Sequence, residues 1–149
     1  MDTIAVNRRA YFDYEILETY EAGIVLTGSE VKSVKSGHVQ LKGSFISIVA
    51  GKALTENLHI SPYKYSNDES YSPLRRRQLL LKKKEIDTLA AASSREGYTL
   101  IPLEIFQKQH LIKILVGVCR GKKAHDKRDV LKKRAIRRDI NQGLKNFSR

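Results

Sequence analysis

The sequence has little of the chemistry on which disulfide frameworks, metal sites and membrane spans depend. Its 149 residues include one cysteine, Cys119, and no tryptophan. A single cysteine excludes an internal disulfide and any metal site built from cysteines alone, which fits a reducing compartment. No apolar run reaches the roughly 18 residues of a membrane span, and residues 1–16 lack the apolar core of a signal peptide. We therefore expect a cytoplasmic protein.

Sequence signatures of catalysis are also missing. There is no Gly-rich phosphate loop, no His-x-x-x-His or Cys-x-x-Cys pair of metal ligands, and no Gly-x-Ser-x-Gly turn. The histidines are scattered, and Cys119 ends an apolar run, so we interpret it as a core residue. An RNA-modifying enzyme would need a cofactor loop or an acid and base pair that the sequence does not offer. We expect no enzymatic activity, no cofactor and no metal.

Positive charge is in excess, and most of it lies at the C-terminal end. The formal net charge is +12. Residues 1–116 carry 16 basic and 13 acidic side chains, whereas residues 117–149 carry 12 and 3. A segment of that charge density repels itself and favours a polyanion that releases counterions on binding. Nucleic acid is the first candidate, because an anionic membrane would need apolar anchors and the tail offers Phe147 alone among its aromatics.

Alternating or β-branched apolar runs predict a chain made mainly of strands. The turn-forming Ala22-Gly23 is expected to separate the first two strands, and Gly51-Lys52 and residues 107–110 to close two hairpins. In chain order the expected strands cover residues 12–16, a run that begins at 24–26, 44–50, 53–60, 98–106 and 111–119.

Two short helices are expected between these strands. The first covers residues 28–37, with Ser29 as its cap, Gly37 as its stop and Val31 and Val34 facing the core. The second covers residues 82–95 and ends before Gly97, whereas residues 61–73 form a polar loop.

This order of elements predicts a mainly β fold. Hairpins outnumber crossovers, so the sheet should be antiparallel, and small antiparallel sheets close into barrels that leave few exposed edges. We expect a small barrel of the oligonucleotide-binding type with two or three short helices. Residues 1–120 would form this RNA-binding domain, and residues 121–149 a basic C-terminal tail.

The tail carries a narrow apolar stripe at helical spacing, formed by Ile136, Ile140, Leu144 and Phe147. It is only about 80° wide at 3.6 residues per turn, and Gly143 weakens the helix by about 1 kcal/mol relative to alanine. We hypothesise that the tail is disordered when free and becomes helical against RNA. The alternative is a tail folded permanently against the barrel.

Circular dichroism separates these two states. A peptide spanning residues 121–149 should show little helical signal in plain buffer and gain it when RNA is added, because the stripe needs a surface to pack on. A strongly helical spectrum from the free peptide would contradict the hypothesis.

Three basic clusters suit a phosphate backbone, although each alone is also typical of a solvated face. They are Arg8-Arg9, residues 75–77 with 82–84, and the tail. Arginine forks two donors onto a phosphate or stacks on a base. Aromatic side chains that stack on bases lie near these clusters in the sequence; they are Tyr11, Phe12, Tyr63, Tyr65 and Tyr71.

The segment 121–128 places His125 and Asp126 among four cations, directly after the last expected strand. His125 can stack on a base, and Asp126 can orient a guanidinium or accept a hydrogen bond from a base amine. A solvated hinge is the alternative interpretation.

Several blocks of residues together resemble the SsrA-binding protein (SmpB) family, in order and from about residue 5 to residue 128. The tail beyond Arg128 is similar only in character, and Phe12 stands where the family commonly has a histidine. The blocks are Asn7-Arg8-Arg9-Ala10, Tyr20-Glu21-Ala22-Gly23-Ile24, Gly28-Ser29-Glu30-Val31-Lys32-Ser33, Leu79-Leu80-Leu81 and Gly121-Lys122-Lys123-Ala124-His125-Asp126-Lys127-Arg128.

The resemblance implies a bacterial trans-translation factor that is not an enzyme. Such a protein binds the tRNA-like domain of transfer-messenger RNA and delivers it to ribosomes stalled without a stop codon. Its fold would be an oligonucleotide-binding-type barrel with surrounding helices. Elongation factor Tu and alanyl-tRNA synthetase are further partners that the resemblance implies, through the RNA. A ribosomal or ribosome-assembly protein is the alternative, because it would share the barrel and the basic tail.

The resemblance also assigns roles to individual residues. The implied RNA contacts are Asn7, Arg8, Arg9, Glu21, Glu30 and Lys32, with Arg75 and Arg77 nearby. Glu21 and Glu30 are interpreted as acceptors for base edges or as groups that orient basic side chains, with simple salt bridges as the alternative. The residues implied to occupy the empty messenger channel and decoding region of the ribosome are Lys122, Lys123, His125, Asp126, Lys127 and Arg128.

Overall fold

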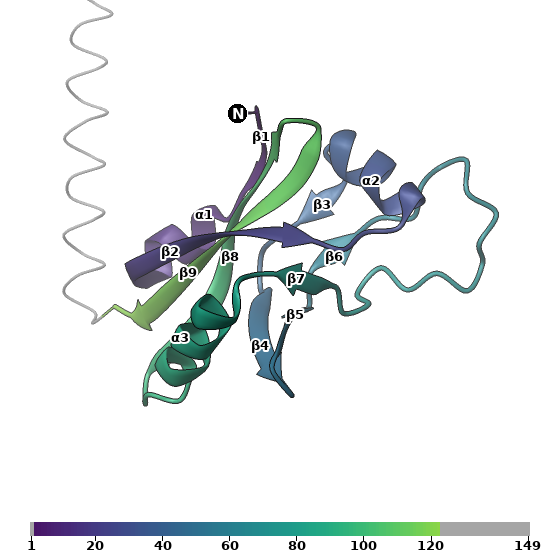
Figure 1. Ribbon diagram of the computed structural model, residues 1–149. Coiled ribbons are helices and arrows are strands. Elements are labelled where there is room, and N and C mark those ends of the chain that lie inside the picture. Colours follow the sequence, from purple (N-terminus) through teal and green to yellow (C-terminus); the bar gives the residue numbers. More distant parts are fainter. Residues whose placement is uncertain (1, 123–149) are drawn as a thin grey trace, which may run out of the picture.

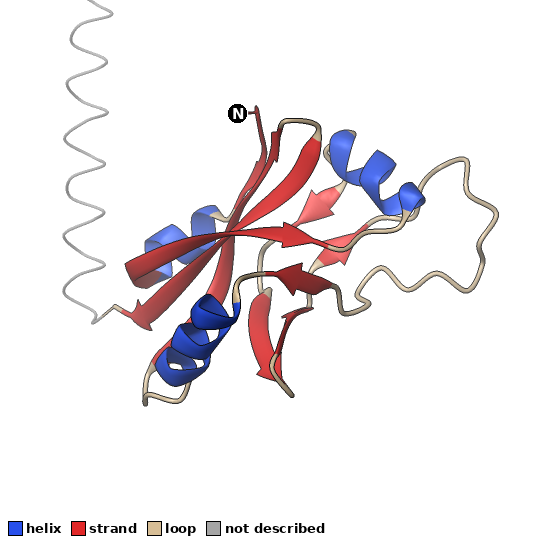
Figure 2. Cartoon of the chain, viewed as in Figure 1, coloured by secondary structure: helices blue, strands red, loops and turns tan. Residues whose placement is uncertain are grey.

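A computed structural model describes residues 2–122 of the chain, which form nine strands and three helices (Figures 1 and 2). The elements are β1 (Asp2–Val6), α1 (Arg8–Asp13), β2 (Tyr14–Ile24), α2 (Gly28–Lys35), β3 (Val39–Gln40), β4 (Phe45–Val49), β5 (Lys52–Glu56), β6 (His59–Ile60), β7 (Gln78–Leu80), α3 (Lys83–Ser93), β8 (Tyr98–Lys108) and β9 (Leu111–Gly121). No helix in this part of the chain is both long enough and apolar enough to cross a membrane.

Seven of the strands form one antiparallel sheet in the order β1-β8-β9-β2-β7-β5-β4, and β3 pairs with β6. The long β8–β9 hairpin and β2 make its centre, where Gly117 faces Ile101 on one side and Thr19 on the other. The antiparallel prediction is therefore confirmed. Strand β4, at one end of the sheet, also lies close to β8 near the other end, so the sheet curves back on itself.

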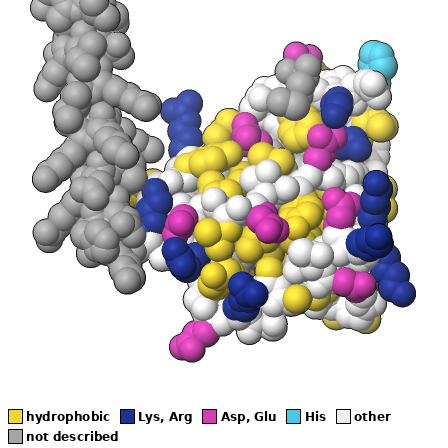
Figure 3. Space-filling view, turned by 60° about the vertical axis from the view of Figure 1, so that its left-hand side comes forward, with side chains coloured by type: hydrophobic (Ala, Val, Ile, Leu, Met, Phe, Trp, Pro, Cys, Tyr) yellow, Lys and Arg dark blue, Asp and Glu magenta, His cyan; other side chains and the backbone are white. Residues whose placement is uncertain are grey.

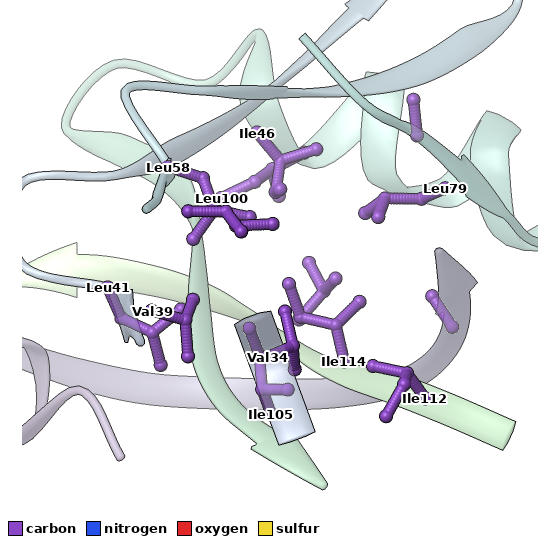
Figure 4. Close-up of a cluster of buried hydrophobic side chains, with 14 of the residues drawn as sticks. Val34, Val39, Leu41, Ile46, Leu58, Leu79, Leu100, Ile105, Ile112 and Ile114 are labelled. Atoms are coloured by element: carbon purple, nitrogen blue, oxygen red, sulfur yellow. The ribbon is translucent and has the colours of Figure 1, made fainter. Parts of the chain in front are cut away.

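The main core lies inside this curved sheet and draws side chains from helices and strands alike (Figure 4). Val34 of α2, Leu79 of β7, Leu100 of β8 and Ile114 of β9 are all buried there. A smaller cluster lies beneath α1 and contains Cys119, which confirms the interpretation of that residue as core. Burial raises the pKa of the Cys119 thiol to about 11, which keeps it in its unreactive protonated form.

The beginning of the chain differs from the expectation. Residues 8–13 form a helix rather than the start of a strand, because Asn7 caps the backbone: its Oδ1 accepts a hydrogen bond of 3.2 Å from the amide of Ala10. The predicted turn at Ala22-Gly23 was also wrong, since β2 continues through it to Ile24. A Cβ atom on Gly23 would lie 3.3 Å from the Cβ of Leu80 in β7, so the glycine allows close strand packing there.

The other expected helices, hairpins and loop are present, although some of their first and last residues differ from those expected. Helix α2 and its stop at Gly37 (φ +82°) are confirmed, but the cap is Thr27 rather than Ser29. Both hairpins and the second helix are present, and residues 61–77 form neither helix nor strand. The run 53–60 divides into two strands, because Asn57 adopts a positive φ of 56° that interrupts the extended backbone.

A tight contact at the sheet centre generates a test of this packing. A Cβ atom on Gly117 would lie 2.6 Å from Leu103 Cδ1, whereas one on Gly121 of the same strand would meet nothing within 4 Å. Leu103 is fully buried, so Gly117→Ala should destabilise the fold by about 1–3 kcal/mol through overpacking.

Urea unfolding measures this cost, with Gly121→Ala as the matched control. The control should unfold at nearly the wild-type midpoint. Equal midpoints for the two variants would show that the packing around Leu103 is looser than described.

Candidate nucleic-acid interface

A buried carboxylate at the start of α2 organises the candidate site. Thr27 and Glu30 form a capping box: the Glu30 amide donates to Thr27 Oγ1 at 3.2 Å, and the Thr27 amide donates to Glu30 Oε1 at 2.9 Å. Capping fixes the Glu30 side chain against the helix end and leaves its carboxylate facing the segment that precedes β7. The side chain has no exposed surface.

Two arginines and a tyrosine from that segment surround the carboxylate. Arg77 Nε donates to Glu30 Oε2 at 2.7 Å, and Arg75 binds both carboxylate oxygens, with its Nε at 3.1 Å from Oε2. The Tyr71 hydroxyl lies 3.0 Å from the same Oε2. Glu30 is thus held by three side chains that follow it by more than forty residues in sequence, and we call this group the Glu30 cluster.

The charges of the Glu30 cluster stabilise the ionised carboxylate. Burial alone would raise the pKa of Glu30, but hydrogen bonds from Arg75, the Thr27 amide and Arg77 outweigh it and hold the pKa at about 2. The carboxylate therefore stays charged at neutral pH, although it is removed from water. A buried ion pair of this kind does not guarantee net stability, but losing one partner leaves an uncompensated charge.

Arg77 is enclosed by protein rather than presented to solvent. Its side chain has no exposed surface, and it also donates to the carbonyl oxygens of Leu58 at 2.6 Å and Pro73 at 3.0 Å and to the Tyr71 hydroxyl at 2.9 Å. All of these partners lie within the protein. In the structure Arg77 therefore ties the loop before β7 to the core, and it holds Glu30 in place.

Arg75 and Lys32 are two basic groups of this region that reach solvent. The Arg75 side chain is about one-third exposed while it remains bound to Glu30. Lys32, two residues beyond Glu30 in α2, is exposed and places its Nζ 5.2 Å from the centre of the Tyr63 ring. The structure thus brings Glu30, Lys32, Arg75 and Arg77 into one neighbourhood, with two of the four at the surface.

The residues from 7 to 9 form a second group, around α1. Asn7 is buried, and its side-chain amide donates to the carbonyl oxygens of Leu41 at 3.2 Å and Pro102 at 3.0 Å. Arg8 and Arg9 are exposed on the helix that Asn7 caps. Arg9 pairs with Asp13 at 2.9 Å and lies over the Phe12 ring at 5.6 Å.

Glu21 belongs to neither group. It lies on β2 and faces Lys108 at 3.4 Å and Lys113 at 3.9 Å, which belong to the β8–β9 hairpin. These two lysines belong to no local motif, so sequence reasoning missed them. The antiparallel pairing of β2 with β9 and of β9 with β8 brings them to Glu21. Figure 3 shows acidic and basic side chains together on one face of the molecule, where Lys and Arg side chains surround a central area of apolar and acidic side chains.

Of the expected tail contacts, only Lys122 falls within the described residues. Its backbone amide donates to the Asp13 carbonyl at 3.1 Å, and its Nζ donates to the Tyr11 carbonyl at 3.2 Å. Lys122, the last described residue, therefore lies beside α1. The expected sites at Lys123, His125, Asp126, Lys127 and Arg128 lie outside the described residues.

Within residues 2–122, no group of three or more His, Cys, Asp and Glu side chains is placed to hold a metal ion. A curved antiparallel sheet, exposed basic side chains on two helices and a strongly basic C-terminal segment define a small nucleic-acid-binding protein of the β class. Comparison with known sequences is more specific: the profile described as "SmpB protein" matches residues 4–146. The chain belongs to the SmpB family, whose members bind RNA and are not enzymes.

Individual relatives agree with this assignment over nearly the full chain. The SsrA-binding protein of Clostridium novyi is 47% identical over 148 residues, which is 99% of this chain and 94% of that protein. The SsrA-binding protein of Elusimicrobium minutum is 49% identical over 142 residues, 95% of this chain and 90% of that protein. A chain in the solved structure named "tmRNA-SmpB: a journey to the center of the bacterial ribosome" is 47% identical with a TM-score of 0.69, covering 80% of this chain and 85% of that one.

The Glu30 cluster generates a prediction for stability. Glu30→Gln should lower the free energy of unfolding by about 3–5 kcal/mol, because it leaves buried Arg77 without its counter-charge. Glu15→Gln is the control, since Glu15 pairs with Arg120, both side chains are about half exposed, and the loss should cost less than about 1 kcal/mol. Urea unfolding of both variants would refute the assignment if the two costs were equal.

The same cluster predicts how stability depends on pH. The folded-state pKa of Glu30, about 2, lies below the ordinary 4.5, so its contribution is complete above about pH 5 and is lost as the pH falls. The stability difference between wild type and Glu30→Gln should therefore shrink by about 2 kcal/mol between about pH 6 and about pH 3. Unfolding curves at both pH values measure it; a constant difference would show that the folded-state pKa of Glu30 is not lowered.

Proposed function

We propose that this protein binds the tRNA-like domain of transfer-messenger RNA and delivers it to stalled ribosomes for trans-translation, so that incomplete polypeptides are tagged and the ribosomes are rescued. Family membership over nearly the full chain, with 47% identity to the SsrA-binding protein of Clostridium novyi, carries the proposal. It also favours this adaptor over a ribosomal or ribosome-assembly protein. The protein acts by holding RNA, and the bound RNA and the ribosome carry out the chemistry.

The candidate RNA-binding residues divide into two roles according to their burial. Arg8, Arg9, Lys32 and Arg75 reach solvent, so they contact the RNA itself, chiefly its phosphates. A guanidinium that is already bound to a carboxylate, as Arg75 is, has a fixed direction and loses less conformational entropy on binding.

The buried residues of the predicted site act through these four. Asn7 caps the helix that carries Arg8 and Arg9, and Glu30 with Arg77 fixes Arg75. Glu21 is exposed beside two lysines, which favours its role as a group that orients basic side chains.

The finer architecture supports the same function. We infer that the curved sheet is a barrel of the oligonucleotide-binding type, because the end strand β4 lies close to β8 and the remaining strands are paired in one continuous order. Residues 1–120 form the RNA-binding domain of this proposal. Residues 121–149 form the tail, disordered when free and helical when bound, which occupies the empty messenger channel and the decoding region of the small subunit.

The tail residues proposed to work there are Lys122, Lys123, His125, Asp126, Lys127 and Arg128. A channel that still holds a message excludes the tail, and this exclusion restricts delivery to ribosomes whose message has run out. Elongation factor Tu and alanyl-tRNA synthetase join the complex through the RNA, in the cytoplasm.

Competition binding tests the proposed function. The full-length protein should prefer the tRNA-like domain of transfer-messenger RNA over ordinary tRNA, and the preference should persist as salt is raised, because any protein of net charge +12 binds RNA weakly at low salt. Equal competition by the two RNAs, with both affinities collapsing in salt, would identify a general polyanion binder instead.

The two exposed arginines of α1 yield a prediction for RNA affinity. Arg8→Ala combined with Arg9→Ala should weaken binding of the tRNA-like domain by roughly tenfold or more and lower the salt slope by about 1.5, because two phosphate contacts are lost. Lys52→Ala, which removes an exposed positive charge from the β4–β5 hairpin, is the control and should leave both the affinity and the salt slope unchanged. A double variant that matches this control would remove α1 from the interface.

A further inference from the structure

A cavity of about 130 Å³ lies between the start of α2 and the long loop that joins β6 to β7. In Figure 1 this loop extends beyond α2 at the right-hand side of the molecule. The lining includes Ser29 of the helix and Tyr63, Ser66, Asp68 and Tyr71 of the loop. Glu30 also reaches its wall, so the cavity adjoins the Glu30 cluster.

Two aromatic rings of this cavity are suited to hold a flat ligand. Tyr71 is fixed, because its hydroxyl lies 3.0 Å from both Glu30 Oε2 and the Ile60 carbonyl oxygen and accepts a hydrogen bond from Arg77. Tyr63 is half-buried, with Lys32 over its ring. Aromatic side chains held in this way provide stacking surfaces for unpaired nucleobases.

Polar groups in the lining of the same cavity are suited to recognise the edge of a base. Ser29 and Ser66 carry hydroxyls, which either donate or accept, and Asp68 carries a carboxylate, which accepts from an exocyclic amine. Asp68 is positioned by its own loop, since its Oδ1 accepts from the Ser70 amide at 3.0 Å and from the Ser70 hydroxyl at 2.6 Å. The edge of a purine or pyrimidine presents donors and acceptors to match such a set.

Two cations next to the cavity are placed to bind the phosphate of a nucleotide. The Nζ of Lys32 lies 5.2 Å from the centre of the Tyr63 ring, on one side of it, and Arg75 is bound to Glu30 while about one-third of its side chain stays exposed. The negative charge of Glu30 is balanced by its two arginines, so it does not repel a phosphate. Aromatic walls, polar groups for the base edge and phosphate-binding cations therefore lie together at one place.

We propose that this cavity receives one unpaired base of the bound RNA, stacked on Tyr63 and read at its edge by Asp68 and the serine hydroxyls, with the adjoining phosphate on Lys32 or Arg75. The inference rests on the proposed function, because it names a nucleotide subsite within the same RNA interface. It explains how a mainly electrostatic surface gains a contact that persists in salt.

The test uses the full-length protein and the tRNA-like domain of transfer-messenger RNA, probed with dimethyl sulfate, which modifies unpaired bases, and with hydroxyl radicals, which report the backbone. Wild type should protect an unpaired base, and Tyr63→Ala should lose that protection, keep the backbone footprint and bind roughly five- to a hundredfold more weakly, the loss expected for one base stack. Tyr63→Phe should behave like wild type, because the ring remains.

Leu74→Ala is the control, since Leu74 belongs to the same loop but is 50% exposed and outside the lining. Wild-type affinity and protection in folded Tyr63→Ala would overturn the subsite and leave the proposed function intact. Equal weakening by Tyr63→Ala and Leu74→Ala would also overturn it, because the loop as a whole would then be responsible. Failure of the wild-type protein to select the tRNA-like domain would overturn the proposed function itself, and the subsite with it.

Discussion

The ionised carboxylate of Glu30, buried between α2 and the loop before β7, is the constraint on which the candidate interface depends. Its partners Arg75, Arg77 and Tyr71 come from a segment that is neither helix nor strand, so the cluster gives that segment its place. Exchanging such a cluster for apolar side chains often preserves or increases stability, so its value lies in the single arrangement that it imposes. Here that arrangement directs Arg75 to the surface and fixes Tyr71 beside a cavity.

Patterns with strong local causes were predictable from the sequence. Apolar patterning and turn residues predicted both hairpins and two of the helices, and charge and absent motifs predicted a nucleic-acid-binding protein without catalysis. Local patterning misled at residues 12 and 13, which belong to the helix capped by Asn7, whereas residues 14–16 begin β2 as expected. It misled again at Gly23, which allows close strand packing and forms no turn. The alternation of apolar and polar residues along one segment does not show which distant strand packs against that segment.

The candidate site was predictable in composition but not in burial. The resemblance named Asn7, Glu30 and Arg77 beside Arg8, Arg9 and Lys32, yet nothing in one sequence separates the buried from the exposed members. That separation arises from pairings across more than forty residues, which bring Arg75 and Arg77 to Glu30. Under the proposed function, this separation divides the residues between two tasks, contact with RNA and support of that contact, and it gives the buried acidic side chain the second task.

The central claim, that Glu30 serves RNA binding by holding Arg75 rather than by touching RNA, is tested most directly by a double-mutant cycle. Affinity for the tRNA-like domain would be measured for Glu30→Gln, Arg75→Gln and the double variant, below the unfolding temperature of all three. If the carboxylate acts through the guanidinium, the double variant should lose no more affinity than Arg75→Gln alone. Losses that add fully would place Glu30 in contact with RNA and contradict the account.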